Sequence, residues 1–330
     1  MKKKKETPPP IHVIKDKGIS ASLVGAFFQC RRKALIRMLG TKPNRIQPAL
    51  AYGSLGHAVL ERIYKCWKAG KKTPSVRRSL YQEAAIFEQN NGQFWTEKCR
   101  QTFEEHKARL LGVLPAYVEH YEERDRAAEW LMVEDWFKHE VDIEGELVKF
   151  TGKVDLAKRE DDGTIWVMDS KFLGRIDTYA LPIVMPFDLQ TNLYTFVVGE
   201  RYGQYAEGMI YNIVRKPGQR LKKGETLKQL TERIAEDVAS QPAHYFIRYP
   251  QPVLPEEQDA FIEEAKDTLQ EMLDWEEDGF RPRPRFGISC LGVYGLCEYA
   301  GICLQDNLEW YHSWRFESNT KAFHAALKGV

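Results

Sequence analysis

Apolar residues recur with helical spacing in the first part of the chain and alternate in a strand-like way in its middle. Over residues 23–38, and again over 50–67, apolar positions return every three or four residues, which predicts two helices. Residues 75–128 are more charged but keep a mostly helical pattern. We expect two or three helices there, interrupted near Gly92 and Pro115, because glycine and proline both weaken a helix interior.

The pattern changes at Trp130, where β-prone residues begin. Strands are predicted over 130–141, 147–157 and 164–172, and the polar run 160–163 contains an Asp-Gly pair that is typical of a hairpin turn. The remaining predicted elements are a helix over 188–199, a strand over 206–216, a helix over 225–239, a strand over 244–249, a helix over 255–277 and a loop-rich C-terminal part.

The predicted hairpin carries two carboxylates and a lysine. Its register can bring Asp155 and Asp169 to the same end of two paired strands, and Lys171 shares a face with Asp169 because side chains alternate along a strand. Two carboxylates and an ammonium group suit a divalent metal and an activated water, which is the equipment of phosphodiester hydrolysis. The alternative for an isolated Asp-x-Lys is a solvated charge pair on an exposed strand face.

Two predicted helices carry polar pairs with i, i+4 spacing, so each pair shares one helix face. His57 and Glu61 form the first pair, and an imidazole is a competent ligand for Mn²⁺. Gln190 and Tyr194 form the second pair, and their amide and hydroxyl groups suit hydrogen bonds to a phosphate or a nucleotide. Taken singly, His57 could be a surface histidine and Tyr194 a core residue.

The composition indicates a globular protein without a membrane span. The 330 residues are 43% hydrophobic and 12% aromatic, which is enough for a substantial core. No apolar run approaches bilayer length, and the lysine-rich start has no apolar segment behind it, so we expect a cytoplasmic protein. The net charge of +1 neither favours nor excludes nucleic acid, because 48 basic and 47 acidic residues can gather on different faces.

The six cysteines are unevenly placed, and three of them form the pattern Cys290-x6-Cys297-x5-Cys303. In a cytosolic chain, clustered cysteines favour a metal over disulfides. Zinc sites usually show two close cysteine pairs, which this chain lacks, whereas an iron–sulfur cluster accepts three clustered thiolates and a remote one. Cys30 is the natural fourth ligand, while Cys66 and Cys99 lie in helical stretches and are expected to be buried thiols.

Together these segments resemble the RecB-type branch of the PD-(D/E)XK nuclease superfamily. They resemble most its iron–sulfur members, which are the CRISPR-associated adaptation nucleases and the AddB-type helicase–nuclease subunits. The resemblance spans roughly residues 19–303. It rests, in chain order, on the serine–helix–cysteine segment 19–31, the Gly-x-x-x-His helix of 53–61, Gly152-Lys-Val-Asp155, Asp169-Ser170-Lys171, Gln190-x3-Tyr194 and Cys297-x5-Cys303.

The chain departs from the family pattern at one place. Cys290 and Cys297 have six residues between them, where the family commonly has two. The insertion Leu-Gly-Val-Tyr-Gly-Leu contains two glycines and can loop out. An iron–sulfur cluster is therefore expected, with Zn²⁺ as the fallback.

The resemblance implies an α/β fold of restriction-endonuclease type. It consists of a mixed central sheet flanked by helices, with a helical insertion and an iron–sulfur clamp joining the N- and C-terminal segments. The expected domains are a disordered basic tail (1–17), an N-terminal helical region with the first cluster cysteine and the metal-site histidine (18–128), the nuclease core (129–253) and a C-terminal helix with the cysteine-rich segment (254–330).

The resemblance also assigns roles to the candidate residues. Mg²⁺ or Mn²⁺ would be bound by Asp155, Asp169, the Ser170 carbonyl and His57, with Glu61 as a lower-ranked outer partner. Lys171 would orient the attacking water and stabilise the developing charge, and Gln190 and Tyr194 would position the DNA strand. A structural [4Fe–4S] cluster would be bound by Cys30, Cys290, Cys297 and Cys303.

The sequence therefore predicts a metal-dependent DNA nuclease, and an exonuclease on single strands or duplex ends rather than a site-specific endonuclease. No helix-turn-helix or P-loop is present, so helicase activity would have to come from a partner helicase or recombinase. One alternative is a non-catalytic subunit that binds DNA ends in a helicase or recombination complex. A second is a structural protein that binds zinc.

Overall fold

The computed structural model describes residue 14 and residues 18–43, 48–177, 179–280, 287–292, 295–305 and 311–313. The chain folds into two compact units. The smaller unit combines Met1–Arg45, Phe137–Gly152 and Ala260–Val330, and the larger one combines Ile46–Trp136 and Lys153–Asp259. Each unit is assembled from separated stretches of chain, whereas the boundaries expected from the sequence at residues 128 and 253 divide it in order. Those boundaries stay a prediction.

A five-stranded mixed sheet organises the larger unit. The strand order is β2-β3-β4-β5-β6; β3 and β4 are antiparallel, β4 and β5 are parallel, and β5 and β6 are antiparallel. The strands are β2 (Glu129–Ile143), β3 (Glu146–Arg159), β4 (Ile165–Leu173), β5 (Gly208–Arg215) and β6 (Phe246–Pro252), of which β2 and β3 extend into the smaller unit. The predicted α/β class with a mixed sheet is confirmed.

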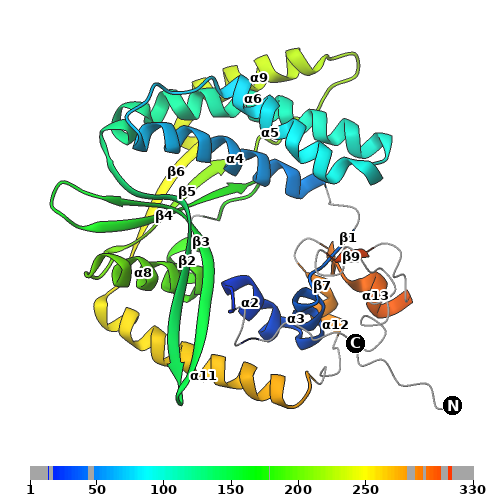
Figure 1. The fold of residues 1–330 in the computed structure, drawn as a ribbon. Helices are drawn as coiled ribbons and strands as arrows, with labels where there is room; N and C mark the ends of the chain where they lie inside the picture. The colour runs from blue at the N-terminus through cyan, green and yellow to red at the C-terminus, as the bar shows by residue number, and fades with distance from the viewer. Residues whose placement is uncertain are drawn as a thin grey trace. The chain divides into compact units, whose positions relative to one another are not determined.

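Helices cover both faces of β4 and β5 (Figure 1). On one face α4, α5, α6 and α9 form a layer whose apolar side chains share one core with Met168, Ile210 and Val214 of the sheet. Helix α8 lies on the opposite face, where Thr191 hydrogen-bonds to Tyr211. The helices of this unit are α4 (Pro48–Lys68), α5 (Val76–Asn91), η1 (Gly92–Phe94), α6 (Glu97–Ala127), α7 (Leu181–Val184), η2 (Met185–Phe187), α8 (Leu189–Tyr202), α9 (Leu227–Ser240) and α10 (Pro242–Tyr245).

The interruption expected at Pro115 does not occur, because α6 continues through this proline. Leu114 and Tyr117 beside it are fully buried, and at Gly112 the helix passes so close to Ile234 of α9 that an added Cβ would lie 2.6 Å from that side chain. Packing on both sides therefore outweighs the local cost of the proline. The break expected near Gly92 is confirmed, since α5 ends there.

The hairpin turn between β3 and β4 forms where the sequence predicts it. Glu160 and Thr164 are joined by a backbone hydrogen bond of 2.9 Å, and Gly163 has a φ of +88°. A side chain would be strained in this left-handed conformation, which explains the glycine. The predicted strands and helices that follow, up to residue 277, agree with the structure to within a few residues.

The smaller unit brings described segments near the start of the chain together with segments near its end. Strand β1 pairs with β9, and Ile36 and Leu39 pack with Tyr299, Ile302 and Tyr311 in a small core. Its elements are α2 (Ala21–Gln29), α3 (Arg31–Met38), β1 (Thr41–Pro43), most of α11 (Pro255–Glu277), α12 (Gly287–Cys290), β7 (Leu291–Gly292), β8 (Gly295–Leu296), α13 (Ala300–Gln305) and β9 (Tyr311–Ser313). Among the helices that the structure describes, none has the length and apolar character needed to cross a bilayer.

Candidate active site

The β3–β4 register sets the two predicted carboxylates against each other. Leu156 and Met168 are the last paired residues at this end of the ladder, and Asp155 and Asp169 are the next residues along the two strands. The Ser170 N–H of β4 donates to the Asp155 carboxylate at 3.0 Å, so Asp155 lies against the residue that follows Asp169. The two carboxylates, which are distant in sequence, therefore belong to one site in the larger unit.

Asp155 accepts two polar contacts on a single oxygen. His57 of α4 places its Nδ1 3.3 Å from Asp155 Oδ2, and the Ser170 backbone N–H donates to the same oxygen at 3.0 Å. Helix α4 presents His57 to the strand because Gly56 lets the helix lie directly on Phe172. The structure thus brings together His57, Asp155 and Ser170, three of the predicted metal-site residues.

Asp169 forms the second half of the site with Lys171. The two side chains, on the same face of β4, make an ion pair between Lys171 Nζ and Asp169 Oδ2. Lys171 also donates to Gln190 Oε1 at 2.9 Å, and the Asp188 side chain caps the helix that carries Gln190. A glutamine in the first turn of α8 therefore holds the same ammonium group that pairs with Asp169.

One site residue was missed by the sequence reasoning. Glu134 of β2 belongs with His57 and Asp155 to a group whose potential ligand atoms all lie within 4.8 Å of one another. This is the one group of three or more such ligand atoms among the residues that the structure describes. Glu134 has a φ of +52°, and Met132 and Val133 beside it are both buried, so the alternation of β2 shifts here as in a β-bulge. No common sequence rule marks such a shift at a glutamate, so the sequence did not reveal this residue.

The pKa values of the two aspartates of the site are shifted in opposite directions. Burial raises the pKa of Asp169 to about 7, with a further rise from the charge of Asp155 and a partly opposing effect of Lys171. Burial acts in the same direction on Asp155, but the hydrogen bond and charge of His57 and the Ser170 N–H outweigh it, so the pKa of Asp155 is lowered. Asp155 is therefore held in its charged form, whereas Asp169 gains or loses its proton near neutral pH.

The remaining charged groups respond to the same crowding of carboxylates. Burial lowers the pKa of His57, but Asp155, Asp169 and Glu134 overcome this and leave it raised. The pKa of Lys171 is also raised, because Asp169 outweighs the effect of burial. Burial and then Asp155 raise the pKa of Glu134, against the lowering effect of Lys153.

This arrangement fits a divalent cation. Asp169 Oδ2 is buried, and no hydrogen-bond donor with good geometry reaches it within the described part of the chain, although the Lys171 ammonium lies against it. The carboxylates of Asp155 and Glu134 group with the His57 imidazole, and the ion pairs described for this part of the chain join Lys153 to Glu134 and Lys171 to Asp169. Carboxylate oxygens with one imidazole nitrogen are donors that suit Mg²⁺ or Mn²⁺.

Two predicted residues lie at the margin of this arrangement. Tyr194 is buried and hydrogen-bonded to Gln190; burial, opposed by that bond, and the negative charges of Asp169 and Asp155 raise its pKa to about 12. Glu61, which was expected as an outer partner of the metal, pairs with Lys65 on its own helix.

The cysteines do not form a ready metal site. No disulfide joins any two of the six, and no three of their sulfur atoms lie within 4.8 Å of one another, as a tetrahedral zinc site would require. Cys290 and Cys297 nevertheless flank the β7–β8 hairpin, where the Cys297 N–H donates to the Cys290 carbonyl at 2.8 Å. The hairpin therefore brings Cys290 and Cys297 together although six residues separate them in sequence. Cys66 and Cys99, expected to be buried, are only half-buried.

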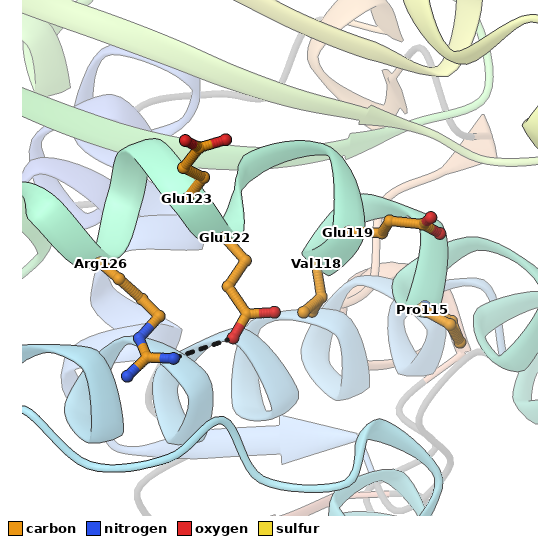
Figure 2. A pocket seen from close by; sticks show the side chains of 6 residues that line it. All are labelled: Pro115, Val118, Glu119, Glu122, Glu123 and Arg126. Atoms are coloured by element: carbon orange, nitrogen blue, oxygen red, sulfur yellow. Dashed lines mark hydrogen bonds and ion pairs between the residues drawn. The ribbon is translucent and has the colours of Figure 1, made fainter.

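A surface hollow of about 610 Å³ lies on α6, separate in its lining from these residues (Figure 2). Its lining consists of Pro115, Val118, Glu119, Glu122, Glu123 and Arg126, and Arg126 and Glu122 make a contact of 3.4 Å along α6. None of the predicted site residues contributes to it. Its three glutamates make it unsuitable for a phosphate backbone.

Comparison with known proteins identifies the family. No curated protein matches the chain. Among the solved structures that match is the crystal structure of SSO0001, with 18% sequence identity, coverage of 67% of this chain and 80% of that chain, and a TM-score of 0.31, too low to support an argument from the superposition. The family model of the PD-(D/E)XK nuclease superfamily matches residues 18–304. That match covers most of the chain and includes every residue of the site described above, so the chain belongs to the PD-(D/E)XK nuclease superfamily.

Proposed function

We propose that this protein is a Mg²⁺- or Mn²⁺-dependent DNA nuclease of the RecB-type branch, with Asp155, Asp169 and Lys171 at its catalytic centre. The observation that carries the proposal is the end of the β3–β4 ladder, where Asp155 accepts from the Ser170 N–H and Lys171 pairs with Asp169. His57 on Asp155 supports the assignment to this branch, because the resemblance rests in part on a histidine helix of this kind.

The metal would be held by Asp155, Asp169 and His57, with the Ser170 carbonyl and Glu134 as further ligands. When bound, such an ion supplies charge for the scissile phosphate and lowers the pKa of a nearby water. The chain's own residues prepare the site: the Ser170 N–H holds Asp155 in place, and Gln190 keeps the Lys171 ammonium directed at Asp169. A fixed ammonium is preorganised to stabilise the negative charge that develops on the phosphate.

An exposed apolar segment between the elements that carry Lys171 and Gln190 supports binding of unpaired DNA. Residues 179–187 join β4 to α8, and Tyr179 and Phe187 are 89% and 86% exposed, with Ile183 and Val184 exposed between them. Exposed aromatic rings on a segment that joins these two elements suit stacking with successive unpaired bases. We therefore propose single strands or frayed duplex ends as substrates, an exonuclease mode of attack, and a helicase or recombinase as the partner that delivers them.

A [4Fe–4S] cluster on Cys30, Cys290, Cys297 and Cys303 is part of the same proposal. Support comes from the hairpin that pairs Cys290 with Cys297, and from Cys297 and Cys303 packing on one small core with residues of α3. Anaerobic purification should give a brown protein with about four irons per chain, and Cys297→Ser should lose the iron. A colourless protein with a stoichiometric amount of zinc would show that the cysteines bind Zn²⁺ and not an iron–sulfur cluster.

The catalytic assignment is tested with end-labelled linear DNA and a circular single strand as substrates. With Mg²⁺ or Mn²⁺ the wild type should shorten the linear strands from an end and spare the circle. Lys171→Met should lower the rate by about two to three orders of magnitude. Lys158→Met is the matched control, because Lys158 lies in the same hairpin and pairs with Glu160 at the turn, away from the two aspartates.

Two outcomes would change the conclusion. If Lys171→Met cleaves as fast as the control, the site assignment is wrong. If the wild type binds DNA ends tightly without cleaving them at any metal concentration, the protein is the non-catalytic subunit that the sequence left as the alternative.

A further inference from the structure

A row of polar side chains crosses the sheet face beneath α4 and α6. Ser170 of β4, Asn212 of β5 and Arg248 of β6 are register partners on adjacent strands. The rows on either side are apolar and belong to the hydrophobic core: Met168 with Ile210, and Phe172 with Val214 and Phe246. One polar row thus runs through an otherwise apolar interface.

Asn212 is the centre of this row and is completely buried. Its Nδ2 donates to Ser170 Oγ at 3.0 Å and to the Tyr117 hydroxyl at 2.8 Å, while its Oδ1 accepts from Arg248 Nε at 3.2 Å. The amide orientation that these partners select leaves Asn212 with both donors and its acceptor in use. In this orientation every hydrogen-bonding group of the Asn212 side chain has a partner.

A buried ion pair fixes the other end of the row. The guanidinium of Arg248 contacts both carboxylate oxygens of Asp125, which is 2% exposed on α6. The Tyr64 hydroxyl of α4 donates to Asp125 Oδ2 at 2.8 Å and lies 2.7 Å from the Tyr117 hydroxyl. The network therefore joins two helices and three strands through fully formed hydrogen bonds.

Stability alone does not account for such a network. Burying polar and charged groups is costly, and well-packed apolar residues of similar volume are often equally or more stabilising. The network ends at Ser170, which lies between Asp169 and Lys171 in sequence and whose N–H holds Asp155 at 3.0 Å. Its hydroxyl is held by Asn212 on the face of β4 that α4 and α6 cover, while its neighbours Asp169 and Lys171 point to the other face.

We propose that Asn212 is a positioning residue for the metal-binding end of β4. By holding the Ser170 hydroxyl, Asn212 fixes the backbone conformation of β4 at Ser170. That conformation orients the side chains of Asp169 and Lys171 and aims the Ser170 N–H at Asp155. This inference rests on the proposed function for its catalytic consequence, but its effect on metal binding can be measured independently. Hydrogen-bond partners behind metal ligands typically contribute about 10- to 100-fold in metal affinity or activity.

Three variants separate positioning from support of the fold. Asn212→Leu removes the bond to Ser170, and Ser170→Ala removes only the hydroxyl while keeping the backbone carbonyl and N–H. Tyr64→Phe is the control, because it removes the contacts of the network with Asp125, Arg248 and Tyr117 but makes no direct contact with Ser170 or Asn212. For each, Mn²⁺ affinity is measured by electron paramagnetic resonance titration, Ser170 amide exchange by NMR in metal-free protein, and Tm by thermal unfolding.

Asn212→Leu and Ser170→Ala should weaken Mn²⁺ binding about tenfold or more and speed exchange of the Ser170 amide. Tyr64→Phe should lower Tm yet bind Mn²⁺ within about twofold of the wild type, well below the tenfold of a lost outer-shell partner. If Ser170→Ala binds Mn²⁺ like the wild type, or if all three variants lose affinity in proportion to their loss of Tm, the proposal is overturned. A wild type that binds Mn²⁺ but cleaves no DNA would refute the proposed function while leaving the positioning result intact.

Discussion

Helix α4 lies so close to β4 at Gly56 that this position has no room for a side chain. A Cβ added there would lie 2.3 Å, 2.4 Å and 2.7 Å from the Cζ, Cε1 and Cε2 atoms of the Phe172 ring. Gly53, one turn earlier on the same helix, offers the matched comparison, because its added Cβ would meet only Phe172 Cβ at 4.0 Å. Alanine should therefore have opposite effects at the two positions.

The magnitude follows from two contributions. Replacing a helical glycine by alanine gains roughly 0.5–1 kcal/mol in conformational free energy at either position. At Gly56 the ring must also move, and it packs edge-on against Tyr52, with centroids 6.0 Å apart, and against His57, with centroids 5.4 Å apart. Forcing atoms into a packed contact of this kind costs about 1–3 kcal/mol. Because the propensity gain is common to both, Gly56→Ala should be about 1–3 kcal/mol less stable than Gly53→Ala.

Thermal unfolding of the two variants measures this difference directly. For a unit of this size 1 kcal/mol corresponds to about 2–4 °C in Tm, so the variants should differ by several degrees, with Gly53→Ala above the wild type. Gly56→Ala should also weaken Mn²⁺ binding, because the displaced ring presses on His57. Equal Tm values for the two variants, with unchanged Mn²⁺ affinity, would refute the argument that α4 and β4 are held in fixed contact.

Three further predictions concern separate parts of the larger unit. The raised pKa of Asp169, about 7, means that its carboxyl binds a proton in the metal-free folded protein below that pH and has lost it above. Mn²⁺ must displace this proton and also the proton of His57, whose pKa is raised, so affinity measured by calorimetry should fall by at least about tenfold per pH unit as the pH drops below 7; a flat profile from pH 5 to 8 would contradict the assignment. Phe187→Ala should raise KM for single-stranded DNA by about 5- to 100-fold with little change in kcat, as loss of one stacked base would, whereas Tyr81→Ala, also exposed, should change neither in the same assay. Arg248→Met leaves the Asp125 carboxylate buried without its cation, so urea unfolding should show a loss of about 3–5 kcal/mol; a loss below 1 kcal/mol would mean that water reaches the pair.

Much of the candidate site could be read from short stretches of sequence. The turn at Gly163 and the alternation on both sides of it fix the register of β3 and β4, and that register brings Asp155 and Asp169 to the same end of the two strands. The i, i+2 spacing likewise puts Lys171 on the same face as Asp169. These relations depend on local backbone geometry, which neighbouring residues decide.

Other parts of the site depend on contacts between distant segments. Glu134 joins His57 and Asp155 only because β2 changes its alternation at a residue with positive φ, which no common sequence rule signals for a glutamate. Pro115 has the sequence signature of a helix end, yet packing of α6 on its neighbours keeps the helix continuous. In both cases tertiary packing overrides the local preference.

The sequence by itself determined the order of the elements, the hairpin with its two aspartates and lysine, and the family to which they belong. Only the tertiary structure decided that Glu134 joins the metal-binding group, that Glu61 turns to Lys65, and that Asn212 holds Ser170 from behind. The physical reason is that hydrogen bonds and turns between near neighbours are set by backbone conformation. Which distant polar groups meet is set instead by the packing of α4 and α6 on the sheet, where each buried group must find a partner.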